Sequence, residues 1–192
     1  MRKRRDFRPD KWKISLVSHL WLTPKQRKLF FKWAFYAALL IFVSVVQDVV
    51  MSRVRLSGAT TELVPCLIFL ICILENSQRS CIFALVAGLL YLFSGTAPGI
   101  YSMVSITFLG VGVSIFRQTY LQESFSSALL CVAGAMVIYE LVNFAFGLFL
   151  GLTYLSRYSS FLITAGLSLL AIPVLYPVTK AISAIGGNSW RE

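Results

Sequence analysis

The chain has 192 residues, of which 57% are hydrophobic and only 14% charged, whereas soluble domains are about 45–50% apolar and about 25% charged. This composition, with a mean hydropathy of +0.75, excludes an ordinary water-soluble protein, and at roughly 20 residues per membrane span the length leaves room for about six spans. The net charge of +10 would permit nucleic-acid binding, but no nucleic-acid motif accompanies the basic residues, so we expect no nucleic-acid partner.

The basic residues gather in an N-terminal arm, because ten of the 18 lie in the first 28 positions. Such a flank indicates the cytoplasmic side of the first span and attracts anionic lipid. Residues 10–22 carry apolar side chains at helical spacing, which predicts a short helix in the headgroup region; a cytosolic helix packed on the protein itself is the alternative. The residues expected to anchor the arm at the lipid surface are Arg2, Lys3, Arg4, Arg5, Lys11, Trp12 and Trp21.

The first three apolar runs differ in length. Thr23-Pro24-Lys25-Gln26 has the pattern of a helix N-terminus, so a helix should begin near Thr23 and continue into a first span at 29–46, where Lys32 can extend to the headgroups. The runs at 63–74 and 81–93 are shorter than a standard span and bracket a polar turn at 75–80. They are two tightly packed spans or a re-entrant pair, and we favour two spans.

Three further spans follow. Residues 100–116 form the fourth, with a polar connection at 117–124. The long apolar run at 125–155 is the fifth, and residues 161–178 form the sixth, which is expected to end at Pro177.

These segments predict an all-α polytopic membrane protein with six transmembrane helices. With a cytoplasmic N-terminus, the outside carries only three basic residues, whereas the inside carries at least 14. That bias predicts both termini in the cytoplasm. The expected parts are a basic arm with its interfacial helix at 1–28, a six-span membrane domain at 29–182 and a short cytoplasmic tail at 183–192.

Residues for catalysis are scarce. The single histidine, His19, lies in the basic arm, so no buried His/Asp or Cys/His set is expected. The four cysteines lie within apolar runs without a CxxC pair. Gly112-Val113-Ser114 lacks the second glycine of a nucleophile elbow. We therefore expect neither enzymatic activity nor a cofactor or metal.

A few polar residues within the spans need a protein, water or partner contact, because a carboxylate in lipid costs several kcal/mol. Asp48 lies at the outer end of the first span. Glu140, Asn143, Gly147 and Gly151 share one helical face, where small and polar residues favour close helix packing. This face packs within the chain or binds a partner or ligand.

A family resemblance rests on two stretches: residues 87–101, AGLLYLFSGTAPGIY, and residues 176–182, YPVTKAI. Together with six compact spans and Pro65 in the second run, they resemble the bacterial rod shape-determining protein MreD. The residues that carry the motif are Gly88, Tyr91, Gly95, Pro98 and Gly99. Tyr91 stands where many members of the family have an intramembrane aspartate.

The resemblance implies a non-enzymatic scaffold in the bacterial plasma membrane that functions in cell shape and peptidoglycan synthesis. Its partner would be the bitopic protein MreC and, through it, MreB, RodA and a class B penicillin-binding protein; a homodimer is also compatible. The fold would be similar to the substrate-binding subunits of energy-coupling-factor transporters. The alternative function is therefore vitamin capture by such a subunit.

Overall fold

The computed structural model describes residues 24–50, 59–120 and 124–185, and these ranges hold helices and their connections without a β-strand. The expected all-α class is confirmed. The helices are α1 (Pro24–Val49), α2 (Leu63–Leu74), α3 (Ser77–Phe93), α4 (Ile100–Tyr120), α5 (Phe125–Phe149), α6 (Tyr158–Leu169) and α7 (Ile172–Ala184), with the 3-10 turn η3 (Leu155–Arg157) before α6.

Three of these helices, α1, α4 and α5, are long and apolar enough to cross a membrane. The pair α6 and α7 provides a fourth candidate span, bent by 49° at its break. The remaining apolar helices are shorter, with 12 residues in α2 and 17 in α3. The described chain thus has the helices of a membrane-embedded protein, with three or four candidate spans.

Helix α2 forms the centre of the bundle. All of its residues are buried, and it contacts α1, α3, α4, α5 and α7. A helix that is apolar on every side is stable only when every side is covered, and its neighbours provide that cover. At 1.5 Å per residue α2 is about 18 Å long, which is shorter than the roughly 30 Å hydrocarbon core of a bilayer. The polar residues that flank it are therefore drawn into the protein.

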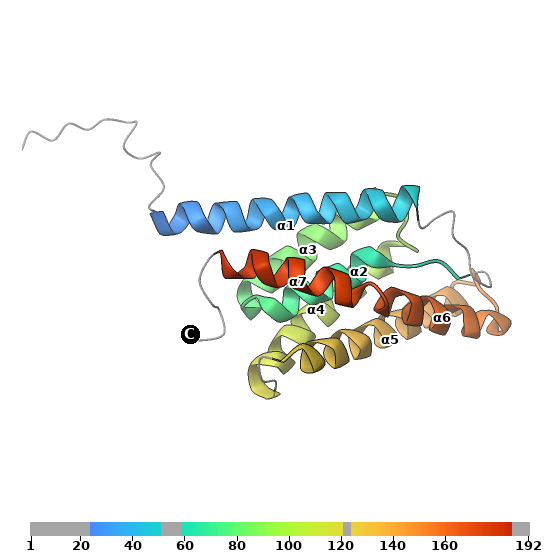
Figure 1. Cartoon of the computed structure of the whole chain (residues 1–192). Coiled ribbons are helices and arrows are strands. Elements are labelled where there is room, and N and C mark those ends of the chain that lie inside the picture. The colour runs from blue at the N-terminus through green and yellow to red at the C-terminus, as the bar shows by residue number, and fades with distance from the viewer. Residues whose placement is uncertain (1–23, 51–58, 121–123, 186–192) are drawn as a thin grey trace, which may run out of the picture.

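Helices α1 to α5 run back and forth along the bundle, and α6 and α7 return together as one bent pair (Figure 1). In the middle of α1, Tyr36 contacts Glu75 directly after α2, whereas near the end of α1, Gln47 contacts Val64 in the first turn of α2. Helices α1 and α2 are therefore antiparallel. We call the two ends of the bundle the Glu75 end, where α2 ends, and the Glu62 end, where α2 begins.

Glycine permits the close approach of α3 and α4. A Cβ atom at Gly110 would lie 3.1 Å from the Cys72 sulfur and 3.2 Å from the Ala84 Cβ. A Cβ at Gly88 would lie 3.4 Å from Met103 Cγ. Both glycines thus support packing within the chain.

The sixth apolar segment differs from its prediction. Instead of one continuous helix over 161–178, the structure has α6 and α7 with a break at Leu170 and Ala171, and the two together remain one candidate span. Pro173 lacks an N–H group and its ring would clash with the carbonyl of Leu169, where α6 ends. Pro177 lies inside α7, which continues to Ala184. The expectation that the segment ends at Pro177 was wrong, because a helix can pass a proline when its neighbours support it.

The fourth and fifth segments also end elsewhere than expected. Helix α4 continues beyond Phe116 to Tyr120, and α5 stops at Phe149, well before residue 155. Gly151 follows with a φ of 70°. The amides of Gly151 and Leu152 donate to carbonyls in the last turn of α5, at 3.0 and 2.8 Å. This is a Schellman motif, which ends a helix at a glycine inside an apolar run.

The start of α1 at Pro24 agrees with the prediction of a helix near Thr23. Thr23 itself and the interfacial segment 10–22 lie outside the described residues. So do the expected lipid anchors Arg2, Lys3, Arg4, Arg5, Lys11, Trp12 and Trp21.

Candidate functional site

Polar side chains from three helices meet the start of α2 at the Glu62 end. The Tyr91 hydroxyl, in α3, donates to Glu62 Oε2 at 3.3 Å. The Glu62 amide donates to the Ser168 hydroxyl of α6 at 2.9 Å, and the Val64 amide donates to Gln47 Oε1 of α1, also at 2.9 Å. These bonds satisfy amides that the first turn of a helix leaves without a partner.

Helix α5 adds a second polar group to this cluster. Tyr139, Glu140 and Asn143 are 0%, 2% and 1% exposed. Glu140 lies close enough to Glu62 for their carboxyl groups to interact electrostatically, and Tyr139 also interacts with Glu62. Among the described residues, the Tyr139 hydroxyl, Glu140 Oε1 and the Asn143 amide atoms have no hydrogen-bond partner. Buried polar atoms of this kind are rare, so they mark a place for water, a proton or a ligand.

We define these residues as the Glu62 cluster, made up of Gln47, Glu62, Tyr91, Tyr139, Glu140, Asn143 and Ser168. Glu62 lies in the connection that precedes α2, outside the helices. Burial raises the pKa of Glu62 to about 7, against the hydrogen bond from Tyr91, which lowers it. In the described ranges, neither Glu62 nor Glu140 forms a salt bridge. The cluster can therefore exchange a proton or accept a polar group.

Tyr91 lies beside a carboxyl group that another segment of the chain supplies. Its side chain is buried, and its hydroxyl meets the carboxyl group of Glu62. A carboxyl group thus lies beside position 91, although the chain supplies it from the segment before α2. The sequence does not indicate this contact, because Glu62 and Tyr91 are 29 positions apart.

The other motif residues shape the connection between α3 and α4. Gly95, with a φ of 76°, follows the end of α3. The Pro98 carbonyl accepts a bond from the Tyr101 hydroxyl at 3.2 Å. A Cβ at Gly99 would lie 2.6 Å from Tyr101 Cε1, so the tyrosine ring takes the space that a side chain would need. The motif therefore builds a compact turn at the Glu62 end.

The predicted stripe on α5 is only partly a single face. Glu140, Asn143 and Gly147 are buried together, whereas Gly151 lies beyond the helix in the Schellman motif. A Cβ at Gly147 would lie 2.9 Å from Thr153 Cγ2, so Gly147 packs against the loop that follows its own helix. Asp48 is half-buried on α1.

A second polar site lies at the Glu75 end. Lys32 forms a salt bridge with Glu75 Oε1, and the Tyr36 hydroxyl donates to the same oxygen at 3.0 Å. Arg117 donates through Nη1 to the carbonyls of Ile73 and Glu75, each at 2.6 Å. A positive charge is stabilising at a helix C-terminus, where the last carbonyls lack partners.

This second site corrects two expectations. Lys32 was expected to extend to the lipid headgroups, but it is buried against Glu75. Arg117 was expected in a polar connection, but it lies within α4 and is buried at the end of α2. Since a buried carboxylate is costly without a paired cation, Glu75 holds Lys32 inside the bundle. Arg117 is held by the backbone carbonyls of Ile73 and Glu75.

Comparison of the chain with models of known protein families, with curated proteins and with solved structures gives no match. The function must therefore be inferred from the residues and contacts of this chain. The two polar ends of α2 and the surface around them provide that basis.

Proposed function

We propose that the chain is a non-enzymatic membrane scaffold with the role of MreD. It crosses the bacterial plasma membrane six times and binds the bitopic protein MreC, through which it acts with MreB, RodA and a class B penicillin-binding protein. The resemblance at residues 87–101 and 176–182 supports this proposal. The surface that follows α5 supports it independently.

Six crossings are supported by the reach of the short helices. Helix α2 extends from the Glu62 end to the Glu75 end, and α3 returns from Ser80, which contacts Cys72, to Tyr91, which contacts Glu62. Each short helix therefore extends along the bundle about as far as the part of α1 between Tyr36 and Gln47, the two residues that contact the ends of α2. Thinning of the bilayer or tilting of the helices can accommodate such lengths.

The direction of insertion follows from charge. Six described basic residues lie in the first half of α1, the first turn of α3, the last turn of α4 and the second half of α7, which are at the Glu75 end: Arg27, Lys28, Lys32, Arg79, Arg117 and Lys180. Arg157, in η3 before α6, lies at the Glu62 end. Cytoplasmic flanks carry the excess of basic residues. The Glu75 end, where α1 begins and α7 ends, therefore faces the cytoplasm, and the Glu62 end faces outward.

The observation that carries the scaffold proposal is an apolar loop at the Glu62 end. The loop 149–155 exposes five large apolar side chains, and Phe149 and Tyr154 are 87% and 75% exposed. Non-helical backbone does not face lipid in the hydrocarbon core, so the loop lies at the outer surface. Large apolar patches at a water-facing surface indicate a protein partner. A bitopic protein with an outer domain is such a partner.

The test is recovery of MreC with the affinity-tagged chain. Replacement of Leu152→Ser together with Leu155→Ser should lower the affinity for MreC about thirtyfold, and the recovered MreC with it, because two truncated interface side chains at about 1 kcal/mol each cost about 2 kcal/mol. Leu130→Ser is the matched control, since Leu130 is equally exposed but lies in α5, away from the loop. Unchanged recovery in the double variant would contradict the scaffold proposal.

A second candidate is supported by the unpartnered polar atoms of the Glu62 cluster. Tyr139, Glu140 and Asn143 face inward near the outer end of the bundle. Convergent polar groups of this kind hold small ligands, as expected of a vitamin-binding subunit similar to those of energy-coupling-factor transporters. Mass spectrometry of small molecules released from the purified chain tests this candidate. A vitamin bound by the parent and lost in Asn143→Leu would support it.

A further inference from the structure

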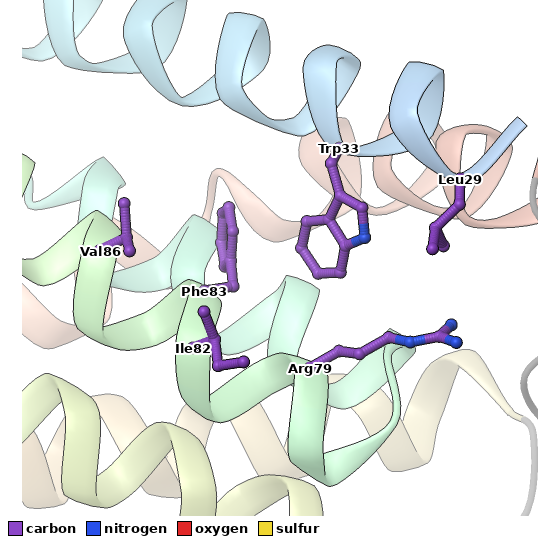
Figure 2. A pocket seen from close by; sticks show the side chains of 6 residues that line it. All are labelled: Leu29, Trp33, Arg79, Ile82, Phe83 and Val86. Carbon is purple, nitrogen blue, oxygen red and sulfur yellow. The ribbon is translucent and has the colours of Figure 1, made fainter. Parts of the chain in front are cut away.

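An apolar groove lies between α1 and α3 near the Glu75 end. Its volume is about 400 Å³, and its lining consists of Leu29, Trp33, Arg79, Ile82, Phe83 and Val86. Figure 2 shows Trp33 and Leu29 extending from α1 toward the α3 side chains. The rings of Trp33 and Phe83 lie 5.6 Å apart and join the two helices. Ile82 and Val86 are exposed, so the groove opens to the outside of the bundle.

Arg79 is the one charged side chain among the described residues of the lining. It is exposed in the first turn of α3. Its backbone amide donates to the Asn76 carbonyl at 3.0 Å, whereas its guanidinium forms no salt bridge with a described carboxylate. Among the described residues at this end, the carboxylate of Glu75 is buried against Lys32. Within the described part of the chain, a guanidinium without a carboxylate partner thus lies at one end of an apolar channel. This arrangement is complementary to a molecule with an anionic head and an apolar tail.

The dimensions favour an acyl chain over a helix. From Arg79 to Val86 the groove follows α3 for about 10 Å. A partner helix about 10 Å wide would fill roughly 800 Å³ over that length, which is twice the available volume. A single acyl chain is far narrower than a helix. Arginine also pairs well with phosphate, because its planar group offers two parallel N–H donors.

We propose that this groove binds one acyl chain of an anionic phospholipid, whose phosphate pairs with Arg79. The lipid belongs to the leaflet at the Glu75 end, because Arg79 begins α3 at that end. It would fill the gap between α1 and α3 and hold the two helices together. This site is separate from the N-terminal basic arm and does not depend on the proposed partner.

The test uses Trp33 as a reporter inside the groove. The full-length chain with Trp12, Trp21 and Trp190 replaced by phenylalanine keeps Trp33 as its one tryptophan. It is placed in nanodiscs of phosphatidylcholine that contain a minor fraction of phosphatidylglycerol with brominated acyl chains. Bromine quenches tryptophan fluorescence on contact, so quenching reports the lipid at Trp33. The reference is the same fraction of brominated phosphatidylcholine.

We expect the anionic lipid to associate with the Trp33 site about fivefold more strongly than phosphatidylcholine, which is the effect of one basic residue at the membrane surface. Arg79→Gln should remove this preference, and Arg79→Lys should retain part of it. Arg157→Gln is the matched control, because Arg157 is also exposed but lies at the opposite end, and it should keep the full preference.

Three results would overturn the proposal: equal quenching by both lipids in the parent chain, an unchanged preference in Arg79→Gln, or little quenching by either lipid, which would mean that protein fills the groove. If Arg79→Gln does not fold, the lipid assignment is tested in the parent chain by adding a competitor of the brominated phosphatidylglycerol. Unlabelled phosphatidylglycerol should relieve the quenching, whereas inorganic phosphate should not. Relief by inorganic phosphate would assign the site to a free anion and overturn the lipid assignment.

Discussion

The ammonium group of Lys32 and the carboxylate of Glu75 form a salt bridge inside the protein, where the two residues are 1% and 0% exposed. They come from α1 and from the residue that follows α2. The hydroxyl of Tyr36 and the guanidinium of Arg117 complete the site. The end of the central helix is thus closed by one acidic and two basic side chains.

Removal of one partner of this pair should strongly destabilise the bundle. In Lys32→Met, the carboxylate of Glu75 would remain buried without its cation, which costs about 3–5 kcal/mol. The double replacement Lys32→Met with Glu75→Gln should be less damaging than Lys32→Met alone. The free energy of unfolding in mixed micelles, measured by detergent titration, tests this order. Equal losses in the single and double variants would mean that the pair is not coupled.

Arg117→Gln should destabilise the end of α2. The variant loses the guanidinium donor to the carbonyls of Ile73 and Glu75, and buried acceptors left without a partner cost about 1–3 kcal/mol. The same detergent titration measures the loss. Arg157→Gln provides the control, because Arg157 is exposed and should change stability by less than about 0.5 kcal/mol.

The sequence predicted the bounds of a helix correctly where charged residues interrupt an apolar run at both ends. The apolar run at 63–74 has the same bounds as α2, because Glu62 and Glu75 interrupt it at both ends. The sequence of the run does not show whether lipid or protein surrounds the helix, because both environments favour a helix that is apolar on every side. Its complete burial became known only from the structure.

The polar contacts could not be predicted, because each joins residues that are far apart in the chain. Tyr36 and Glu75 are separated by 39 positions, and Arg117 and Ile73 by 44. Helical periodicity places Glu140 and Asn143 on one face but does not give the register against α2 or α3. Gly151 was misplaced for a local reason, since its left-handed conformation ends α5 inside an apolar run.

Gly147→Leu should disturb the apolar loop and, under the proposed scaffold role, weaken recovery of MreC. A side chain at Gly147 would meet Thr153, with only 2.9 Å between Cβ and Thr153 Cγ2. The loop 149–155 must then shift, and its exposed apolar residues lose their arrangement. Gly112→Leu is the matched control, since a Cβ at Gly112 meets nothing within 4 Å. Recovery that falls equally in both variants would point to a general loss of folding instead of a change in the loop.

The stability of the purified chain should depend on pH through Glu62. Burial raises the pKa of Glu62 from 4.5 to about 7 in the folded state, so the folded protein binds this proton more tightly than the unfolded protein. Stability should therefore increase as the pH falls from above 7 toward 4.5, where the penalty for burying the charged form disappears. Thermal unfolding in detergent across this range measures the effect.

Two variants test whether Glu62 is the source of this pH dependence. Glu62→Gln keeps an acceptor for the Tyr91 hydroxyl but cannot ionise, so the rise in melting temperature toward low pH should become smaller. Tyr91→Phe removes the hydrogen bond that lowers the pKa of Glu62, so the transition should move to higher pH. If Glu62→Gln leaves the pH profile of the parent unchanged, the dependence arises from another buried group, and Glu62 does not exchange a proton in this range.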